Sequence, residues 1–110
     1  MRIWPVLRHC LAVLVVALGA AVVVSACSGE SRAEVEQGRN IYSQQCARCH
    51  GDAGQGGIGA SLIGVAKRFQ EASAQELFVT NGGAGMPKFG EILSDDEIRD
   101  VVAFTRHQFG

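Results

Sequence analysis

Three residues with reactive side chains lie close together near the middle of the chain. Cys46, Cys49 and His50 form a C-x-x-C-H pattern, which is typical of covalent attachment of a c-type haem through two thioether bonds, with the histidine as an iron ligand. The alternatives are a thioredoxin-like redox pair, a plain disulfide, or a zinc site completed by His107. The redox pair expects a βαβ context that is absent, and the disulfide leaves His50 without a role. We therefore predict one covalent haem c.

A single methionine in a later glycine-rich loop provides a second candidate iron ligand. Met86 stands between Gly85 and Pro87. Most methionines fill apolar cores, but such a filler rarely sits in a glycine loop before proline. We predict that Met86 and His50 occupy the two axial positions of the iron. No small-molecule substrate can then bind, so the protein is predicted to carry electrons and not to be an enzyme. A haem enzyme or gas sensor with an open sixth position is the alternative.

The N-terminus has the pattern of an export signal. Basic residues at Arg2 and Arg8 precede a long uncharged stretch that ends in the sequence V-S-A-C at Cys27. This ending resembles the lipobox of bacterial lipoproteins, so we predict that residues 1–26 are a cleaved signal peptide and that Cys27 is acylated. The alternative is an uncleaved anchor, because the charge-free stretch is about as long as the roughly 20 residues that span a bilayer. A soluble periplasmic protein is the third possibility.

Length and charge narrow the class of protein further. The chain has 110 residues, a net charge of −1 and 6% aromatic residues. One small domain fits this length, and the near-neutral charge argues against a nucleic-acid partner. We divide the chain into the signal peptide, a linker over residues 27–33 and one domain over residues 34–110. A domain of this size buries too little surface to be stable without further support. A bound ligand is expected to complete the core.

The pattern of caps and glycines predicts an all-α fold. Three S-x-x-E capping boxes are expected to open the main helices. They begin at Ser31, Ser73 and Ser94. The first helix is expected over residues 32–45, and the second is expected to end at Asn81, before Gly82. A short helix is expected over residues 65–70. The glycine-rich segments 51–64 and 83–90 are expected to be loops, the first of them wrapped on an apolar object.

These features together resemble a class I cytochrome c of the short, monohaem bacterial type. Gly38 and Tyr42 stand at the glycine and the aromatic residue of that family's N-terminal helix, and Phe104 stands at the aromatic residue of its C-terminal helix. The C-x-x-C-H motif and the Gly-Met-Pro segment also match. The resemblance covers residues 34–109. It implies that the two terminal helices cross near Gly38.

The resemblance also implies surroundings for the haem and a role for the protein. Ala60 stands where the family usually has a proline, whose carbonyl group accepts a hydrogen bond from the proximal histidine, and Leu62 follows it. Both are expected beside the haem. The implied role is single-electron transfer between membrane-associated respiratory or dehydrogenase partners. The N-terminal signal predicts that the protein lies outside the cytoplasm, on the periplasmic side of the envelope in a Gram-negative cell, and is tethered to a membrane. A tethered subunit of a larger oxidoreductase complex is the alternative.

Overall fold

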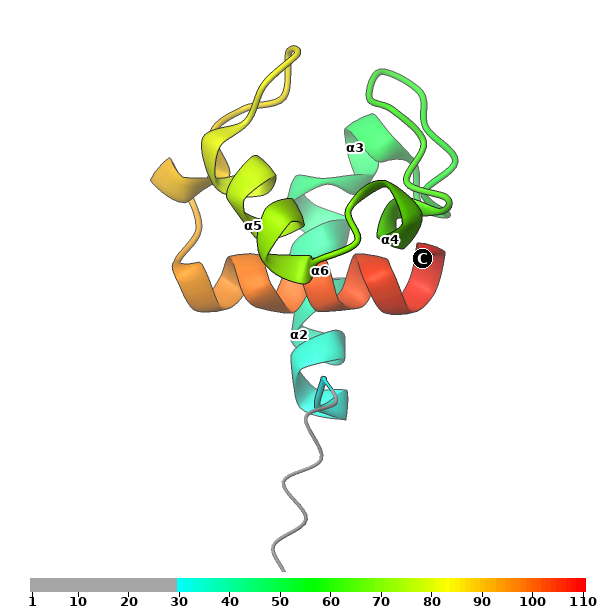
Figure 1. Cartoon of the computed structure of the whole chain (residues 1–110). Coiled ribbons are helices and arrows are strands. Elements are labelled where there is room, and N and C mark those ends of the chain that lie inside the picture. Colours follow the sequence, from blue (N-terminus) through cyan, green and yellow to red (C-terminus); the bar gives the residue numbers. More distant parts are fainter. Residues whose placement is uncertain (1–29) are drawn as a thin grey trace, which may run out of the picture.

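A computed structural model describes residues 30–110, so the predicted signal peptide, Cys27 and the first part of the linker lie outside the described residues. The elements, in order, are α2 (Arg32–Gln45), α3 (Ala47–His50), α4 (Val65–Arg68), α5 (Ala72–Asn81), the 3-10 helix η1 (Phe89–Glu91) and α6 (Asp95–Phe109) (Figure 1). Residues 30–110 contain no strand, only one isolated bridge between Gly83 and Met86. The predicted all-α fold is confirmed. No helix in this part of the chain has the length and apolar character needed to cross a membrane.

The two terminal helices cross at Gly38, as the resemblance implied. Figure 1 shows α6 lying across α2. A Cβ atom on Gly38 would overlap the carbonyl oxygen of Asp100 and would lie 2.8 Å from the Cβ of Phe104. Backbone therefore meets backbone at this crossing, and only glycine leaves enough room.

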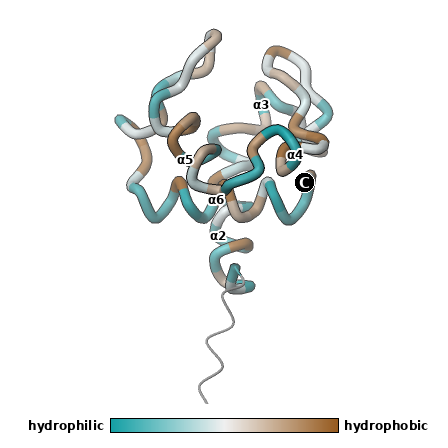
Figure 2. Tube along the Cα trace, viewed as in Figure 1, coloured by the Kyte–Doolittle hydropathy of each residue, from teal (hydrophilic) through white to brown (hydrophobic). Residues whose placement is uncertain are grey.

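An aromatic cluster fills the space beside the crossing. Tyr42 of α2 packs against Phe104 and Phe109 of α6, with ring centroids 5.3 Å and 5.4 Å apart. Ile41 and Val101 are buried in the same cluster. Along α6 the colours alternate between hydrophobic and hydrophilic, as expected of a helix with one buried face (Figure 2). No residue of α5 belongs to this buried cluster.

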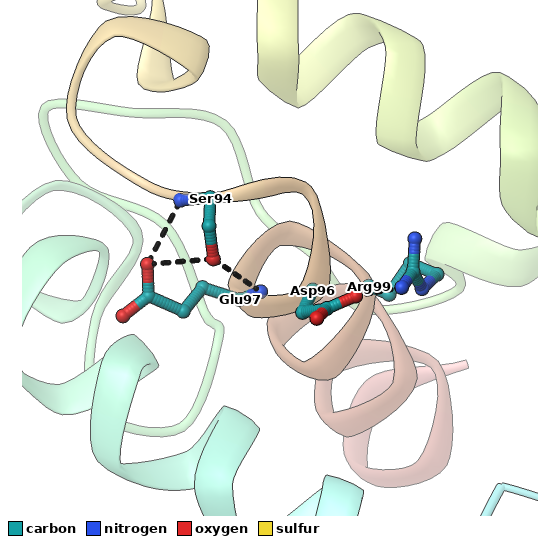
Figure 3. A network of polar contacts seen from close by, with 4 residues as sticks. All are labelled: Ser94, Asp96, Glu97 and Arg99. Atoms are coloured by element: carbon teal, nitrogen blue, oxygen red, sulfur yellow. Dashed lines mark hydrogen bonds and ion pairs between the residues drawn. The ribbon is translucent and has the colours of Figure 1, made fainter.

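The capping boxes at Ser31 and Ser94 are both present. The Ser94 hydroxyl accepts a hydrogen bond from the backbone N–H of Glu97 at 3.3 Å, and the Glu97 carboxylate accepts one from the backbone N–H of Ser94 at 2.8 Å (Figure 3). Asp96, in the first turn of α6, forms an ion pair with Arg99 (Figure 3). Because the caps satisfy backbone donors that the helix itself leaves unpaired, they fix where α2 and α6 begin.

The predicted capping box at Ser73 is wrong. Helix α5 begins at Ala72, its N-cap is Glu71, and no side chain caps it. The guanidinium group of Arg106 instead donates hydrogen bonds to the carbonyl groups of Phe69 at 2.7 Å and Gln70 at 3.2 Å. We attribute the start of α5 to this tertiary contact, which holds the turn immediately before it.

Two short elements were not predicted. A separate short helix, α3, carries the C-x-x-C-H motif after the end of α2. Within the predicted loop 83–90, the chain forms the start of η1, and Phe89 is buried there. The expected loop over residues 51–64 is irregular as predicted, and the predicted helix 65–70 is present as the shorter α4.

The close approach of α2 and α6 at Gly38 can be tested by asking whether a substitution there raises or lowers the stability of the protein. An exposed helical glycine gains about 1 kcal/mol of stability on replacement by alanine. At Gly38 the overlap with Asp100 reverses this sign, so we expect Gly38→Ala to lose about 1–3 kcal/mol. Thermal unfolding measures the change. The control is Gly57→Ala, where the new Cβ would lie 3.6 Å from its nearest contact. A gain in stability from Gly38→Ala would show that the helices do not meet there.

Candidate functional site

The end of α2 and the whole of α3 position the C-x-x-C-H motif. The N–H of Cys46 donates to the carbonyl group of Tyr42 at 2.9 Å, which ends α2, and the N–H of His50 donates to the carbonyl group of Cys46 at 3.0 Å. Cys46 and Cys49 are therefore nearly one helical turn apart, as a bridge to one edge of a planar ligand requires. Both are free thiols.

The imidazole of His50 is held by the loop that follows it. Its Nδ1 atom lies 2.7 Å from the carbonyl oxygen of Ala60, where an Nδ1–H donates. A Cβ on Gly59 would lie 3.0 Å from the His50 ring, so the backbone passes close to it. A hydrogen bond at Nδ1 leaves Nε2 as the atom that can bind a metal. The bond that the resemblance implied for Ala60 is present, although the proline is not.

One cavity brings most of the predicted site residues together. It has a volume of about 250 Å³, and its lining includes Cys46, His50, Ala60, Leu62 and Met86. One water molecule needs about 10–15 Å³, so the space suits a large ligand. Cys49 is half-buried on α3 but does not line the cavity.

The rest of the wall is largely apolar and comes from α4, α5 and α6. Phe69, Phe78 and Val79 line one part of it, and Val101 and Val102 line another. Sequence analysis did not predict the contribution of α5, because its helical pattern alone does not show which of its faces meets a ligand.

Polar side chains in the wall were also missed by sequence analysis. The amide nitrogen of Gln75 donates to the hydroxyl group of Thr105 at 2.9 Å, and Gln75 is 4% exposed. Arg106, which does not itself line the cavity, donates to the Gln75 amide oxygen at 3.4 Å. Arg68 lines the cavity and donates to the carbonyl group of Ser61 at 2.6 Å. Arg68 is the only lining residue of the aspartate, glutamate, lysine and arginine types.

The loop that carries Met86 has an unusual backbone. Gly82, Gly83, Ala84 and Gly85 all have positive φ, and Ala84, with φ of 51°, is the one such non-glycine residue among residues 30–110. The N–H of Met86 donates to the carbonyl group of Gly83 at 2.9 Å, which closes the loop. Glycines adopt this conformation at little cost, so they allow the tight turn that places Met86 in the cavity wall.

Burial affects the ionisation of two groups beside the cavity. It raises the pKa of the Cys46 thiol to about 11, with a smaller contribution from Cys49. Burial likewise raises the pKa of Tyr42 to about 12, with smaller contributions from Cys46 and Asp52. The Tyr42 hydroxyl donates to the carbonyl group of Gly51 at 2.6 Å. Both groups are therefore neutral at pH 7, in keeping with an apolar cavity.

The alternatives for the motif find no support in residues 30–110. Cys46 and Cys49 are not joined as a disulfide, and no group of three or more metal-binding side chains is present in this part of the chain. His107, the fourth ligand that a zinc site needs, is exposed near the end of α6 and does not line the cavity.

A helical fold with a large apolar cavity beside a C-x-x-C-H motif is that of a small c-type cytochrome. Comparison with known proteins gives the same class. A family profile described as "Cytochrome C oxidase, cbb3-type, subunit III" matches residues 33–104. The chain therefore belongs to this family of cytochrome c domains, whose cofactor is covalently bound haem c and whose function is electron transfer.

Relatives of two kinds share this domain. Cytochrome c6 of Bumilleriopsis filiformis is 37% identical over 82 residues, which cover 69% of this chain and 93% of the relative. The cbb3-type cytochrome c oxidase subunit CcoP of Azospirillum sp. (strain B510) is 33% identical over 87 residues, which cover 70% of this chain but 29% of the relative. A cytochrome bc1 complex cytochrome c subunit of Corynebacterium diphtheriae is 33% identical, with 71% of this chain and 28% of the relative covered. The chain thus spans most of the first relative and less than a third of the other two.

Proposed function

We propose that this protein is a monohaem electron carrier in which Cys46 and Cys49 attach the haem and His50 and Met86 ligate its iron. The observation that carries the proposal is the cavity, which has His50 and Met86 in its wall together with Cys46. The donor set fits the group: two free thiols, one imidazole with its Nδ1 already engaged, and one thioether. When bound, haem c accepts and releases one electron.

The chain's own residues have distinct tasks in this proposal. The Ala60 carbonyl holds the His50 ring in one orientation and one tautomer. The largely apolar wall around Phe78 and Val102 keeps water away from the metal. Arg68 is the basic side chain available to the acidic propionate groups of a haem. If His50 and Met86 both bind the iron, no position would be left on it for a substrate, and the protein would act as a carrier and not as an enzyme.

Carbon monoxide distinguishes this proposal from the enzyme and gas-sensor alternatives. The reduced full-length protein is expected to show the spectrum of a six-coordinate c-type haem and to change little when carbon monoxide is added. The measurement is absorbance before and after mixing. A rapid, large spectral change would show that the sixth position is open and would exclude the carrier proposal.

We further propose that the carrier works outside the cytoplasm, tethered to a membrane, with a membrane oxidoreductase or oxidase as its partner. Relatives named as subunits of a cbb3-type oxidase and of a bc1 complex support a second candidate, a tethered subunit of such a complex. Purification in mild detergent separates the two. A free carrier leaves the large complexes during gel filtration, whereas a subunit elutes with them at constant stoichiometry.

The tether is testable at Cys27. If this residue is acylated, Cys27→Ser is expected to accumulate as uncleaved precursor or as a chain without lipid. Mass spectrometry of the mature N-terminus reads the result, and Ser28→Ala serves as the neighbouring control. A wild-type protein that still begins at Met1 would instead establish the uncleaved anchor.

A further inference from the structure

A set of hydrogen bonds, here called the Gln75 network, joins α5 to α6 through the wall of the cavity. An N–H group of Arg106 donates to the amide oxygen of Gln75 at 3.4 Å. The Gln75 amide nitrogen donates to the Thr105 hydroxyl group at 2.9 Å. That hydroxyl group donates to the carbonyl group of Val102 at 3.0 Å. Gln75, Thr105 and Val102 line the cavity, yet neither the proposed attachment of the haem nor the ligation of its iron uses these bonds.

The two ends of the Gln75 network fix the direction of every bond in it. A guanidinium group only donates, so the Gln75 atom that faces Arg106 is the amide oxygen. A backbone carbonyl group only accepts, so the one hydroxyl hydrogen of Thr105 goes to Val102. The Thr105 oxygen then accepts from the Gln75 amide nitrogen. The Gln75 amide is therefore held in one orientation.

One N–H group of Gln75 has no protein acceptor in the described part of the chain. An amide nitrogen carries two hydrogens, and the Thr105 hydroxyl group is the acceptor for one of them. Gln75 is 4% exposed and lines a largely apolar space. Because burying an unpaired donor is unfavourable, this second N–H indicates that the group filling the cavity interacts with it.

Arg106 brings a positive charge into the Gln75 network. Its half-buried guanidinium group also donates to the carbonyl groups of Phe69 at 2.7 Å and Gln70 at 3.2 Å. Neither of the two ion pairs within residues 30–110 includes Arg106, so no carboxylate pairs with it there. A charge acts more strongly across an apolar space than across water. The network therefore presents a positive potential to the cavity.

We propose that Gln75, held in place by Thr105 and Arg106, raises the reduction potential of the haem. This inference rests on the proposed function, because it concerns the one-electron couple of the iron. The oxidised haem carries one more positive charge than the reduced haem, and an N–H group backed by a guanidinium group disfavours that charge. The sign is the same if the N–H binds a haem propionate, because a paired carboxylate stabilises the oxidised form less. Thr105 and Arg106 act through Gln75, as positioning residues.

A redox titration of the full-length holoprotein measures the effect. Gln75→Met replaces the amide by an apolar side chain of similar length. We expect it to lower the equilibrium constant for reduction about tenfold, which is about 59 mV for a one-electron couple. The control is Gln108→Met, which removes an exposed amide from α6 and is expected to leave the potential unchanged. A Gln75→Met variant with the wild-type potential would overturn the proposal.

The same samples show whether a failure lies in this inference or in the proposed function. Wild type and Gln75→Met are both expected to keep the six-coordinate spectrum and to change little with carbon monoxide. An unchanged potential in two proteins that behave in this way would refute the inference alone. A wild-type protein that binds carbon monoxide rapidly would contradict the proposed function, and the inference with it.

Thr105→Val tests the positioning role, because it removes the hydroxyl group and keeps the branched shape of the side chain. We expect the equilibrium constant for reduction to fall about threefold. In the double variant Gln75→Met/Thr105→Val, the fall is expected to be no larger than in Gln75→Met alone, since Thr105 acts through Gln75. Falls that multiply would show two independent effects and would exclude the positioning role.

Arg106→Met and Arg32→Met separate local charge from net charge, because each removes one positive charge. Arg32 is exposed at the start of α2, the end of that helix opposite the C-x-x-C-H motif. We expect the potential to fall several-fold more in Arg106→Met than in Arg32→Met. Equal falls would mean that only the net charge acts, and would overturn the role of Arg106.

Unfolding in both oxidation states separates this role of Gln75 from a purely structural one. A residue that only packs the wall lowers the free energy of unfolding equally in the reduced and the oxidised protein. Gln75→Met is expected to lower it more in the reduced protein, by the amount that corresponds to the fall in potential. Guanidinium chloride titrations with dithionite and with hexacyanoferrate(III) measure the two values. Equal losses would leave Gln75 with a structural role only and would overturn the proposal.

Discussion

Replacing both Cys46 and Cys49 by alanine is expected to remove most of the stable helical structure, and not only the attached haem. The cavity of about 250 Å³ is bounded by α4, α5 and α6. Without the haem this apolar wall is exposed to water, and each large apolar side chain exposed in this way costs about 1.5–3 kcal/mol. Small domains have a total stability of only about 5–15 kcal/mol, so loss of the ligand is comparable to the whole stability of the fold.

The loss of helical structure in the haem-free variant is expected to be uneven along the chain. Helix α5 contributes Phe78 and Val79 to the cavity wall, whereas the cluster around Tyr42 and Phe104 has contacts of its own. Amide exchange should therefore become fast throughout α5, with weak protection left where α2 crosses α6. Circular dichroism measures the overall loss. The control is Arg48→Ala, which changes an exposed residue of the same motif. Near-native helicity in the haem-free double variant would contradict this account.

Sequence patterns predicted the elements that depend on local contacts. Ser31 and Ser94 cap their helices through bonds that reach only three residues, to Glu34 and Glu97. Such bonds depend on spacing alone, so they can be inferred from sequence. The same pattern at Ser73 failed, because Arg106, more than thirty residues away, fixes the turn before α5. No local spacing contains that contact.

The residues of the candidate site also fall into those that the sequence predicts and those that only the fold reveals. Cys46 and His50 could be placed by their spacing, and Met86 by its glycine-rich loop and by resemblance. The contributions of Gln75 and Arg68 could not be predicted, since each is an ordinary polar residue until the fold brings it to the cavity. The sequence shows Gln75 only as a polar residue on a short helix, and such residues more often face solvent. Its bond to Thr105 accounts for its burial instead.

Replacing Met86 by alanine is expected to lower the reduction potential and open the iron to added ligands while the haem stays attached. Cys46, Cys49 and His50 are unchanged in this variant, so attachment is retained. No other methionine occurs within residues 30–110, and His107 does not line the cavity. A thioether favours Fe(II) over Fe(III), so its loss shifts the potential downward by a sizeable part of the ~0.8 V range that axial ligands span.

Spectroscopy of the same variant distinguishes lost ligation from a disturbed loop. The oxidised wild-type protein should show the long-wavelength iron–sulfur charge-transfer band, and Met86→Ala should lack it and gain carbon monoxide binding and weak peroxidase activity. The control is Ala84→Gly, which removes the side chain from the left-handed position at φ of 51° but keeps the sulfur. It should keep both the band and the potential. A wild-type protein without the band would show that Met86 is not the ligand, because a bound thioether produces that band whatever the state of the loop.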